Sequence, residues 1–417
     1  MTSPIPASDA GAASLLRQPA FLSLLSARFL SVLAGQVQSV TIGWQIYTIA
    51  RLHSDVKHAA FAVGMVGLAQ FLPVFALTLV AGEMADRHDR KRIAAICTAA
   101  QAVTALVLTV LAYLHLGQVW PVYLVAAAFG ATRVFLAPAT TAMAPMLVPR
   151  ELFPRAIAWS SLSMQAASIL GPALGGLLCA VSPTLSYGAA VGLYLAACLA
   201  MLTIRGRTRP DAQPGSRWTL VKEGLTYVWT NRIVFGAISL DLFAVLLGGA
   251  TALLPVFARD VLHVGAQGFG LLRSAPAVGA ACIAAILAVK PIRHRAGLFM
   301  FTGVALFGAS TVVFALSKVL MVSVTALAVL GGADMLSVYV RQTLVQIVTP
   351  DPMRGRVAAV SSLFIGASNE LGEFESGIVA RLLGPVGSAL FGGIGALAVT
   401  GLWARMFPAL RKADRLG

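Results

Sequence analysis

The feature that most constrains this chain is a series of apolar runs, each about 20 residues long, that recurs from one end of the sequence to the other. A run of that length, coiled as an α-helix, crosses a hydrocarbon layer about 30 Å thick. Because lipid offers no hydrogen-bonding partner to the backbone, a spanning segment of this kind must be helical. The sequence therefore predicts an all-α polytopic membrane protein.

The composition agrees with a membrane protein. Hydrophobic residues make up 58% of the 417 residues and charged residues only 11%, against about 25% charged residues in a soluble domain. No Walker A motif, nucleophile elbow or H-E-x-x-H motif is found in the sequence, so we expect neither an enzyme nor direct use of ATP. We expect no cofactor and no metal, because the cysteines lack metal-ligand spacing and all fall in apolar runs: Cys97, Cys179, Cys198 and Cys282.

Twelve membrane-spanning helices are predicted from hydropathy. The first is interpreted as a retained span and not as a signal peptide, because no basic region with a cleavage site accompanies it. The predicted spans are residues 21–50, 59–82, 93–114, 119–147, 156–181, 185–204, 233–258, 267–289, 296–317, 319–348, 357–383 and 386–407.

The Lys and Arg residues between the spans predict the orientation. If the N-terminus is cytoplasmic, 22 of the 31 Lys and Arg residues lie on the cytoplasmic side and four lie outside. Cytoplasmic loops carry such an excess, so both termini are expected inside, at the inner (plasma) membrane. The net charge of +15 is then a topology signal. The partner it indicates is the lipid bilayer and not a nucleic acid.

One connection is much longer than the others and divides the spans six and six. Residues 205–232 separate an N-terminal half, 1–204, from a C-terminal half, 233–417. The segment opens like a flexible linker. A short amphipathic helix is predicted in it from apolar residues at helical spacing, either on the inner membrane surface or tying the halves together: Trp218, Val221, Leu225, Val228 and Trp229.

The two halves repeat one another. P-R-E-L-F-P-R-A-I-A-W-S-S-L from Pro149 matches P-D-P-M-R-G-R-V-A-A-V-S-S-L from Pro350 at an offset of 201 residues. The same offset carries Gly171 to Gly372 and Gly176 to Gly377. The repeat predicts two six-helix pseudo-symmetric halves, related by an axis along the membrane normal.

The segment G-E-M-A-D-R-H-D-R-K-R, from Gly82 to Arg92, resembles the loop 2–3 signature of the major facilitator superfamily. The resemblance extends over the whole chain in span count, linker and halves, and it implies the major facilitator fold. It departs at Asp89, where the family usually has Gly; Asp also tolerates the left-handed backbone that Gly permits. The resemblance implies a cytoplasmic gate that helps to hold the outward-open state, made by Gly82, Asp86, Arg87 and Arg90. Positive-inside anchoring alone is the alternative.

Residues 167–176, A-S-I-L-G-P-A-L-G-G, resemble the antiporter motif of drug exporters within that superfamily. The glycines would let two helices approach closely, so ordinary small-residue packing is the alternative. The motif residues are Gly171, Pro172, Gly175 and Gly176. The whole pattern resembles the branch that holds siderophore exporters and macrolide or multidrug efflux proteins.

Charged residues inside predicted spans are costly and so are functional candidates. The repeat aligns Arg28 with Asp241 and Arg133 with Asp334. We expect these charges to form pairs between the halves, or to face each other across a substrate cavity, unless each reaches water at a helix end. Arg341 is a further cavity candidate.

Two carboxylates in the eleventh span are the first candidates for proton coupling. Glu370 and Glu373 are three residues apart, so they lie on one helix face. Two carboxylates this close in an apolar setting do not both ionise easily, which suits a group that takes up and releases a proton. Asp334 and Asp241 are the next candidates. A satisfied polar helix junction is the alternative reading of the glutamates.

These features together predict a secondary active transporter that works by alternating access. We expect a monomeric, proton-coupled exporter of small amphipathic molecules such as drugs or siderophores. Sodium coupling stays open, as do an importer, a lysophospholipid flippase and a non-transporting membrane receptor. Substrate contacts, or else core packing, are predicted for Trp44, Gln45 and Tyr339.

Overall fold

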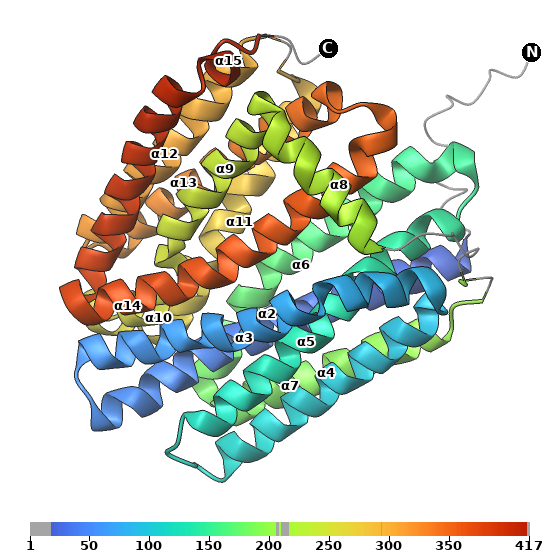
Figure 1. Ribbon diagram of the computed structural model, residues 1–417. Helices are drawn as coiled ribbons and strands as arrows, with labels where there is room; N and C mark the ends of the chain where they lie inside the picture. Colours follow the sequence, from blue (N-terminus) through green and yellow to red (C-terminus); the bar gives the residue numbers. More distant parts are fainter. Residues whose placement is uncertain (1–17, 206–207, 210–216, 293, 415–417) are drawn as a thin grey trace, which may run out of the picture.

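The computed structural model describes residues 18–205, 208–209, 217–292 and 294–414. The described chain is mainly helical and contains no strand (Figure 1). Its long helices are α2 (Pro19–His53), α3 (Val56–Arg87), α4 (Arg90–Tyr113), α5 (Trp120–Met143), α6 (Phe153–Val181), α7 (Pro183–Leu202), α8 (Arg217–Thr230), α9 (Arg232–Leu247), α11 (Gly265–Val289), α12 (Ala296–Leu316), α13 (Leu320–Val348) and α14 (Asp351–Met406).

The seventh span is irregular at its far end. After α9 the chain continues through a 3₁₀ turn at Gly249–Leu253, the short α10 at Leu254–Val256 and a π-helical turn at Phe257–Val261. A terminal α15 (Pro408–Arg411) follows α14, and 3₁₀ turns at Ala144–Met146 and Arg150–Leu152 join α5 to α6. This irregular end of the span contacts α2, α3 and α14.

Eleven helices of the described chain are long and apolar enough to cross a membrane. One of them, α14, has 56 residues and would be roughly 80 Å long as a single helix. It is broken at Gly384, whose φ of 82° is left-handed, and Pro385 follows. Because only glycine adopts that conformation readily, the break separates two spans. The predicted boundary at residues 383–386 is confirmed, and the total is consistent with twelve.

Polar side chains fix where several spans begin. Asp55 accepts a hydrogen bond from the backbone N–H of His58 at the start of α3. Ser182 caps α7 and Asn231 caps α9 in the same way. Each cap satisfies backbone donors that the first helical turn leaves unpaired.

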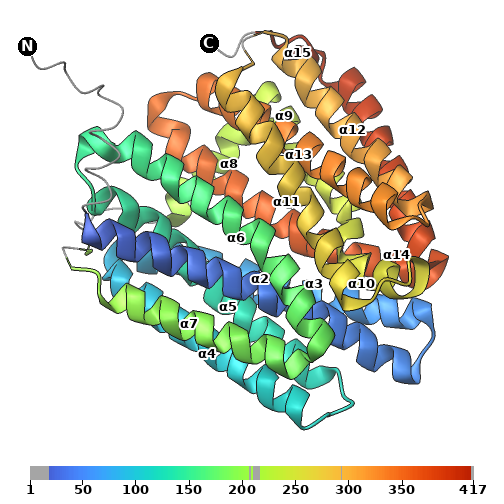
Figure 2. The ribbon, with the colours of Figure 1, turned by 180° about the vertical axis from the view of Figure 1, so that it is seen from behind.

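The helices form two groups, α2–α7 and α9–α14, that meet mainly where α3 packs on α14 and α6 packs on α11 (Figures 1 and 2). The repeat is visible in these contacts. A Cβ built on Gly171 would lie 3.2 Å from the carbonyl oxygen of Leu33 in α2, and one on Gly372 would lie 3.0 Å from that of Leu246 in α9. Residues 201 apart in sequence therefore occupy equivalent places in the two groups.

The molecule has two ends, here called the linker end and the Gly384 end. The linker end carries α8, residues 88–89 between α3 and α4, and the start of α2; the Gly384 end carries Gly384 and the connection from α2 to α3. The two groups of helices touch at the Gly384 end and diverge towards the linker end (Figures 1 and 2).

The predicted helix in the long connection is α8. It packs on α14, where Glu223 and Arg356 form an ion pair and Gly224 fits against the backbone of Arg356. Val228 is buried whereas Trp229 is exposed and stacks on Phe235. The side chains of Trp218 and Val221 lie outside the described part of the chain.

Candidate functional site

A central cavity of ≈ 800 Å³ lies between the two groups of helices. Aromatic and aliphatic side chains form much of its wall, among them Phe129, Phe269 and Phe307. Its charged lining consists of three arginines and three carboxylates, from α2, α5, α11, α13 and α14: Arg28, Arg133, Arg273, Asp334, Glu370 and Glu373. With all six groups ionised, the cavity wall carries no net charge.

Arg133 connects the two groups of helices across the cavity. Its Nη1 lies 3.0 Å from Oε1 of Gln70 on α3 and 3.5 Å from Oε1 of Glu370 on α14. The Arg133 side chain is 49% exposed, whereas that of Glu370 is 14% exposed. The ion pair is long and its arginine is exposed to solvent, so its net stabilising effect is small. It can be exchanged for other partners.

The other two arginines are also loosely held. Arg273 donates to the carbonyl oxygen of Thr251 at 3.2 Å and lies 3.8 Å from Oε1 of Glu373. Arg28 has no ion-pair or hydrogen-bonding partner among the described residues, and it lines the cavity nearer the linker end. The cavity therefore offers guanidinium donors whose hydrogen-bonding capacity is incompletely used.

The charges do not pair as the repeat predicted. Asp241 pairs with Arg341, at 3.3 Å between Oδ2 and Nη2, and not with Arg28. Arg133 pairs with Glu370 and not with Asp334, although both line the central cavity. The repeat identifies equivalent positions in the two halves, but equivalent positions need not face each other.

Arg341 does not belong to the cavity wall. Its side chain is 2% exposed, between Asp241 and the hydroxyl of Ser361. Its Nε has no hydrogen-bonding partner among the described residues. The prediction that Arg341 lines the cavity is therefore wrong for this conformation.

Glu370 and Glu373 both line the cavity from one face of α14, as their spacing predicts. Gly67 of α3 packs directly on this turn: a Cβ there would lie 2.6 Å from the carbonyl oxygen of Glu370 and 2.7 Å from Cβ of Glu373. The two carboxylates thus lie where the groups of helices touch. Glu375 is absent from the cavity lining and contacts its neighbour Ser376.

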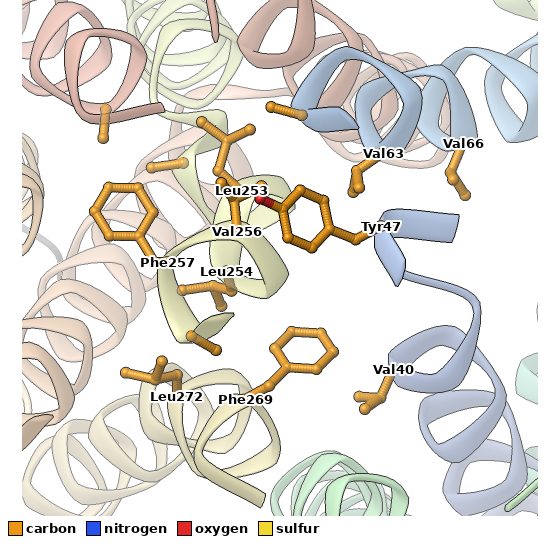
Figure 3. Packing of buried hydrophobic residues seen from close by; sticks show 14 of the residues in the cluster. Val40, Tyr47, Val63, Val66, Leu253, Leu254, Val256, Phe257, Phe269 and Leu272 are labelled. Carbon is orange, nitrogen blue, oxygen red and sulfur yellow. The ribbon is translucent and has the colours of Figure 1, made fainter. Parts of the chain in front are cut away.

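Backbone contacts close the Gly384 end. A Cβ on Gly64 would lie 2.6 Å from Cα of Gly377, and one on Gly176 would lie 2.6 Å from Cα of Gly270. Around them lies an apolar cluster with residues from both groups of helices (Figure 3), including Val40, Val63, Phe257, Phe269 and Leu272. Small residues and apolar packing together exclude water from this end.

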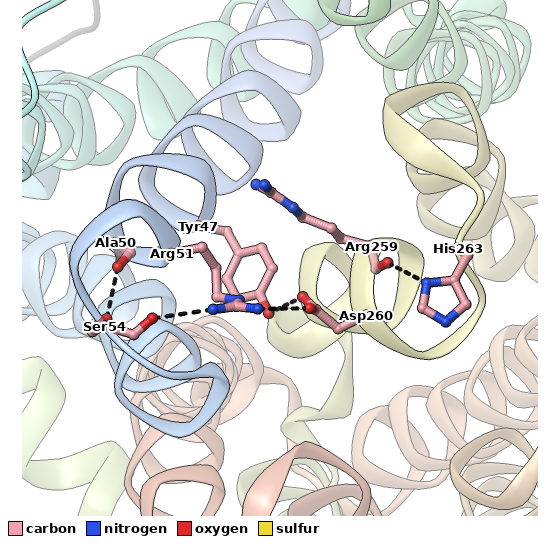
Figure 4. Close-up of polar contacts among 7 residues, drawn as sticks. All are labelled: Tyr47, Ala50, Arg51, Ser54, Arg259, Asp260 and His263. Carbon is pink, nitrogen blue, oxygen red and sulfur yellow. Dashed lines mark hydrogen bonds and ion pairs between the residues drawn. The ribbon is translucent and has the colours of Figure 1, made fainter.

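A polar cluster at the Gly384 end was not predicted from the sequence. Asp260, in the π-helical turn, accepts a hydrogen bond from Tyr47 and lies 3.1 Å from Nη2 of Arg51 (Figure 4). Both partners belong to α2, so the cluster joins the two groups of helices. The only sequence signal was that Arg51 and the adjacent Arg259 and Asp260 are charges at the ends of apolar runs.

The antiporter-like motif forms packing surfaces. Gly175 fits against Val37 of α2, at 3.0 Å from a built Cβ to Cα, and Gly176 fits against α11. Pro172 lies inside α6 and contributes to the cavity wall. The motif therefore lets α6 approach both groups of helices.

The gate motif ties three helices together at the linker end. Arg90 donates to the carbonyl oxygens of Ala85 at 3.0 Å and of Ala142 at 2.8 Å, and its Nη2 lies 3.8 Å from Asp86. Arg87 pairs with Glu83 one turn earlier in α3, and Gly82 is buried in the same helix. In this conformation the contacts of Arg90 join α3, α4 and α5.

Asp89 plays a different part from the glycine it replaces. Its φ is −63°, so no left-handed backbone is needed, and that expectation is wrong. Its carboxylate caps α4 by accepting from the N–H of Lys91 at 3.0 Å and accepts a hydrogen bond from Thr208 at 2.6 Å. The departure from the family pattern thus adds a tie between α4 and the long connection.

The three aromatic and amide candidates for substrate contact lie outside the cavity lining. The Trp44 ring stacks on Phe269 at 5.9 Å between centroids. Gln45 is buried and accepts a hydrogen bond from Tyr187, and Tyr339 packs against an apolar cluster. In this conformation all three side chains pack within the protein, which is the alternative to substrate contact.

Comparison with known proteins gives one family. The family model described as transmembrane secretion effector matches residues 10–416. The enterobactin exporter of Citrobacter koseri is 26% identical over 391 residues, covering 93% of this chain and 92% of that protein. The enterobactin exporter of Escherichia coli O1:K1 / APEC is 26% identical over 410 residues, covering 96% and 94%.

Solved structures share the fold at low identity. A bacterial homologue of the iron transporter ferroportin in an inward-facing state matches with a TM-score of 0.66 at 16% identity, covering 94% of this chain and 99% of that one. A D-xylose–proton symporter matches with a TM-score of 0.70 at 14% identity, covering 91% and 96%. A bacterial homologue of the lysosomal transporter Spinster, inward-facing and unoccupied, matches with 0.71 at 13% identity, covering 95% and 97%.

Proposed function

The chain belongs to the transmembrane secretion effector family of the major facilitator superfamily, and on that premise we propose that it exports an oxygen-rich, amphipathic small molecule of the siderophore type in exchange for protons. The curated relatives are named as exporters of a siderophore, enterobactin, and they match nearly the full chain. The single observation that carries the proposal is the central cavity, whose wall combines aromatic side chains with three arginines and three carboxyl groups.

The cavity chemistry suits a large polar molecule with apolar parts. Its ≈ 800 Å³ is in the size range of ligand pockets. Aromatic walls bind rings, while Arg28, Arg133 and Arg273 donate hydrogen bonds to carbonyl or carboxylate oxygens. Ionised Glu370 and Glu373 accept hydrogen bonds from hydroxyl groups. A wall that carries both guanidinium and carboxylate groups favours a ligand that offers both acceptors and donors.

The same glutamates supply the coupling. A substrate hydroxyl donates to an ionised carboxylate, whereas a protonated carboxyl group has lost much of its capacity to accept. Substrate and proton therefore compete for Glu370 and Glu373, which is what exchange requires. Their long ion pairs with Arg133 and Arg273, at 3.5 and 3.8 Å, leave both carboxylates free to change partner.

Alternating access follows from the two halves, residues 1–204 and 233–417, rocking about the cavity with residues 205–232 as the connection. The excess of Lys and Arg at the linker end supports a cytoplasmic position for that end and for both termini. With the Gly384 end closed, this conformation is inward-facing. Disengaging the Gly384 contacts and closing the linker end would give the outward-facing state, in which Asp86, Arg87 and Arg90 latch the linker end.

Purified protein in liposomes with a pH-sensitive dye inside tests the proposal. Catecholate and hydroxamate siderophores, a macrolide and a lipophilic cation are added under an imposed proton gradient. The siderophores should drive proton movement in the wild type, and Glu373→Gln should reduce it by about 10-fold or more. Glu375→Gln is the matched control, because Glu375 lies on the same helix outside the cavity lining.

Other outcomes would replace the proposal. Equal proton movement by the wild type and Glu373→Gln removes Glu373 as the coupling group. Substrate movement that follows a sodium gradient and ignores pH makes sodium the coupling ion. Accumulation on the opposite side makes the protein an importer.

A further inference from the structure

A second, much smaller cavity lies behind the central one, between α9, α12 and α13. Its volume is ≈ 10 Å³, which is about the least that holds one water molecule. Val245, Phe307 and Asp334 line both cavities and so form the wall between them. The small cavity is therefore one side chain away from the water that enters the central cavity.

Three of the seven residues that line the small cavity are polar. Asp241 and Asp334 both line it, and so does Ser337, which is 3% exposed. Oγ of Ser337 has no hydrogen-bonding partner within the described part of the chain. Ser337 and Arg341 follow Asp334 by three and seven residues, which places all three on one face of α13. A buried hydroxyl without a partner costs free energy, so its position beside two carboxylates points to a bound species.

The charges around the small cavity do not balance without a bound species. Two carboxylates meet one guanidinium, because Arg341 pairs with Asp241 at 3.3 Å while Asp334 forms no ion pair within the described part of the chain. From α12 the lining includes only Val304 and Phe307. On α11, which packs against α13, Arg273 is directed to Glu373. One negative charge is left over, and its burial is costly unless it is neutralised.

We propose that the small cavity is a proton-binding site, in which Asp241 and Asp334 share one proton and Ser337 holds a single water molecule between them. The proton comes from a hydronium ion in the central cavity: it binds an oxygen of Asp334 and leaves one water molecule behind. It returns to water by the same route when the central cavity faces the other side. No other bond forms or breaks.

This site deepens the proposed export mechanism. Only its role in transport rests on that proposal, whereas the existence of the proton-binding site does not. If export is coupled to protons at Glu370 and Glu373, the Asp241–Asp334 site adds a second place where a proton is carried through the cycle. The proton content of the site does not depend on substrate or on the direction of transport. The inference and the proposed function can therefore fail separately.

Counting protons in purified protein without substrate tests the inference. The net protons bound near pH 7 are compared by potentiometric titration for the wild type, Asp334→Asn, Asp241→Asn and the double variant. Removing either carboxylate leaves the other to pair with Arg341 and makes the proton unnecessary. Each single variant should therefore bind one proton fewer than the wild type, and the double variant should also bind only one fewer.

Two results overturn the inference. No change in any variant means that both carboxylates are ionised and the site holds no proton. Losses of one, one and two protons mean that each carboxyl group holds its own proton and nothing is shared. Asp351→Asn, which removes an exposed carboxylate at the linker end, is the control and should leave the count unchanged.

Infrared spectroscopy keeps the test decisive if Asp241→Asn does not fold. The carbonyl stretch of a protonated carboxyl group should be present in the wild type and missing in Asp334→Asn at the same pH. Ser337→Ala should shift the frequency of that band, because the hydroxyl orders the water that contacts it. A band unchanged by Asp334→Asn would overturn the inference.

Discussion

Gly64 and Gly377 lie back to back across the two groups of helices, so close that a Cβ on Gly64 would come within 2.6 Å of Cα of Gly377. Gly176, which the 201-residue repeat relates to Gly377, makes the same approach to Gly270 on the other side of the molecule. The Gly384 end is thus closed twice by backbone-to-backbone contact. No larger side chain fits at either place.

Gly64→Val should open the Gly384 end. The added side chain meets the backbone of α14, which cannot yield as a flexible side chain can. Overpacking of this kind costs about 1–3 kcal/mol, and it falls only on the closed state. Spin labels at the exposed positions Leu52 and Leu382 should report a longer distance in a roughly 10-fold larger share of molecules.

The control for this experiment is Gly188→Val, since a Cβ on Gly188 meets nothing within 4 Å. It should leave the distance distribution of the wild type unchanged. If Gly64→Val also leaves it unchanged, the glycine contact does not decide closure.

Asp260 should contribute to closure through two partners of different strength. Asp260→Asn removes the ion pair with Arg51, which is partly exposed and worth about 0.5–1 kcal/mol. Asp260→Ala also leaves the buried Tyr47 hydroxyl without an acceptor, at about 1–3 kcal/mol. The same labels should therefore show a small shift to the open state for Asn and a larger one for Ala. Asp55→Ala, at the same end but paired with His58 in its own helix, should show neither.

The contact between Arg133 and Glu370 should be weak but measurable. A double-mutant cycle of Arg133→Gln and Glu370→Gln, followed by thermal unfolding in detergent, should give a coupling of about 0.5–1 kcal/mol, because the pair is long and half exposed. The same cycle with Glu375→Gln in place of Glu370→Gln should give no coupling. Equal coupling in both cycles would mean that the effect does not come from this ion pair.

Asp89 should stabilise the linker end in a pH-dependent way. Burial acts to raise the pKa of the Asp89 carboxyl, but hydrogen bonds from Thr208 and from the backbone N–H groups of Lys91 and Arg92 outweigh it and lower the pKa below 3.8. Asp89→Ala removes the cap and should cost about 1 kcal/mol at pH 7.

The sign of the pH effect follows from the lowered pKa. The carboxylate is ionised and stabilising above pH 4 or so, and its contribution is lost as the pH falls through the folded-state pKa. The difference in melting temperature between the wild type and Asp89→Ala should therefore shrink at acid pH. A difference that is constant with pH would show that the hydrogen bonds to the carboxylate do not stabilise the fold.

Much of the architecture is determined by the sequence alone. Apolar runs of membrane-spanning length can only be helices in lipid, and the 56 residues of α14 are too many for one span, so a break within it is required. The repeat from Pro149 to Pro350 fixed which helices are equivalent, and the spacing of Glu370 and Glu373 fixed that they share a face. These properties are local or periodic, so a linear pattern contains them.

Which charges meet was decided only by the tertiary structure. Arg133 pairs with Glu370 and Asp241 with Arg341, whereas the repeat pointed to other partners. The contact of Tyr47 and Arg51 with Asp260 joins residues more than 200 positions apart. Asp260 lies in a π-helical turn that no periodicity in the sequence predicts. Partner choice depends on how whole helices are rotated and tilted against each other. That is set by packing such as Gly64 on Gly377, which no single segment of sequence specifies.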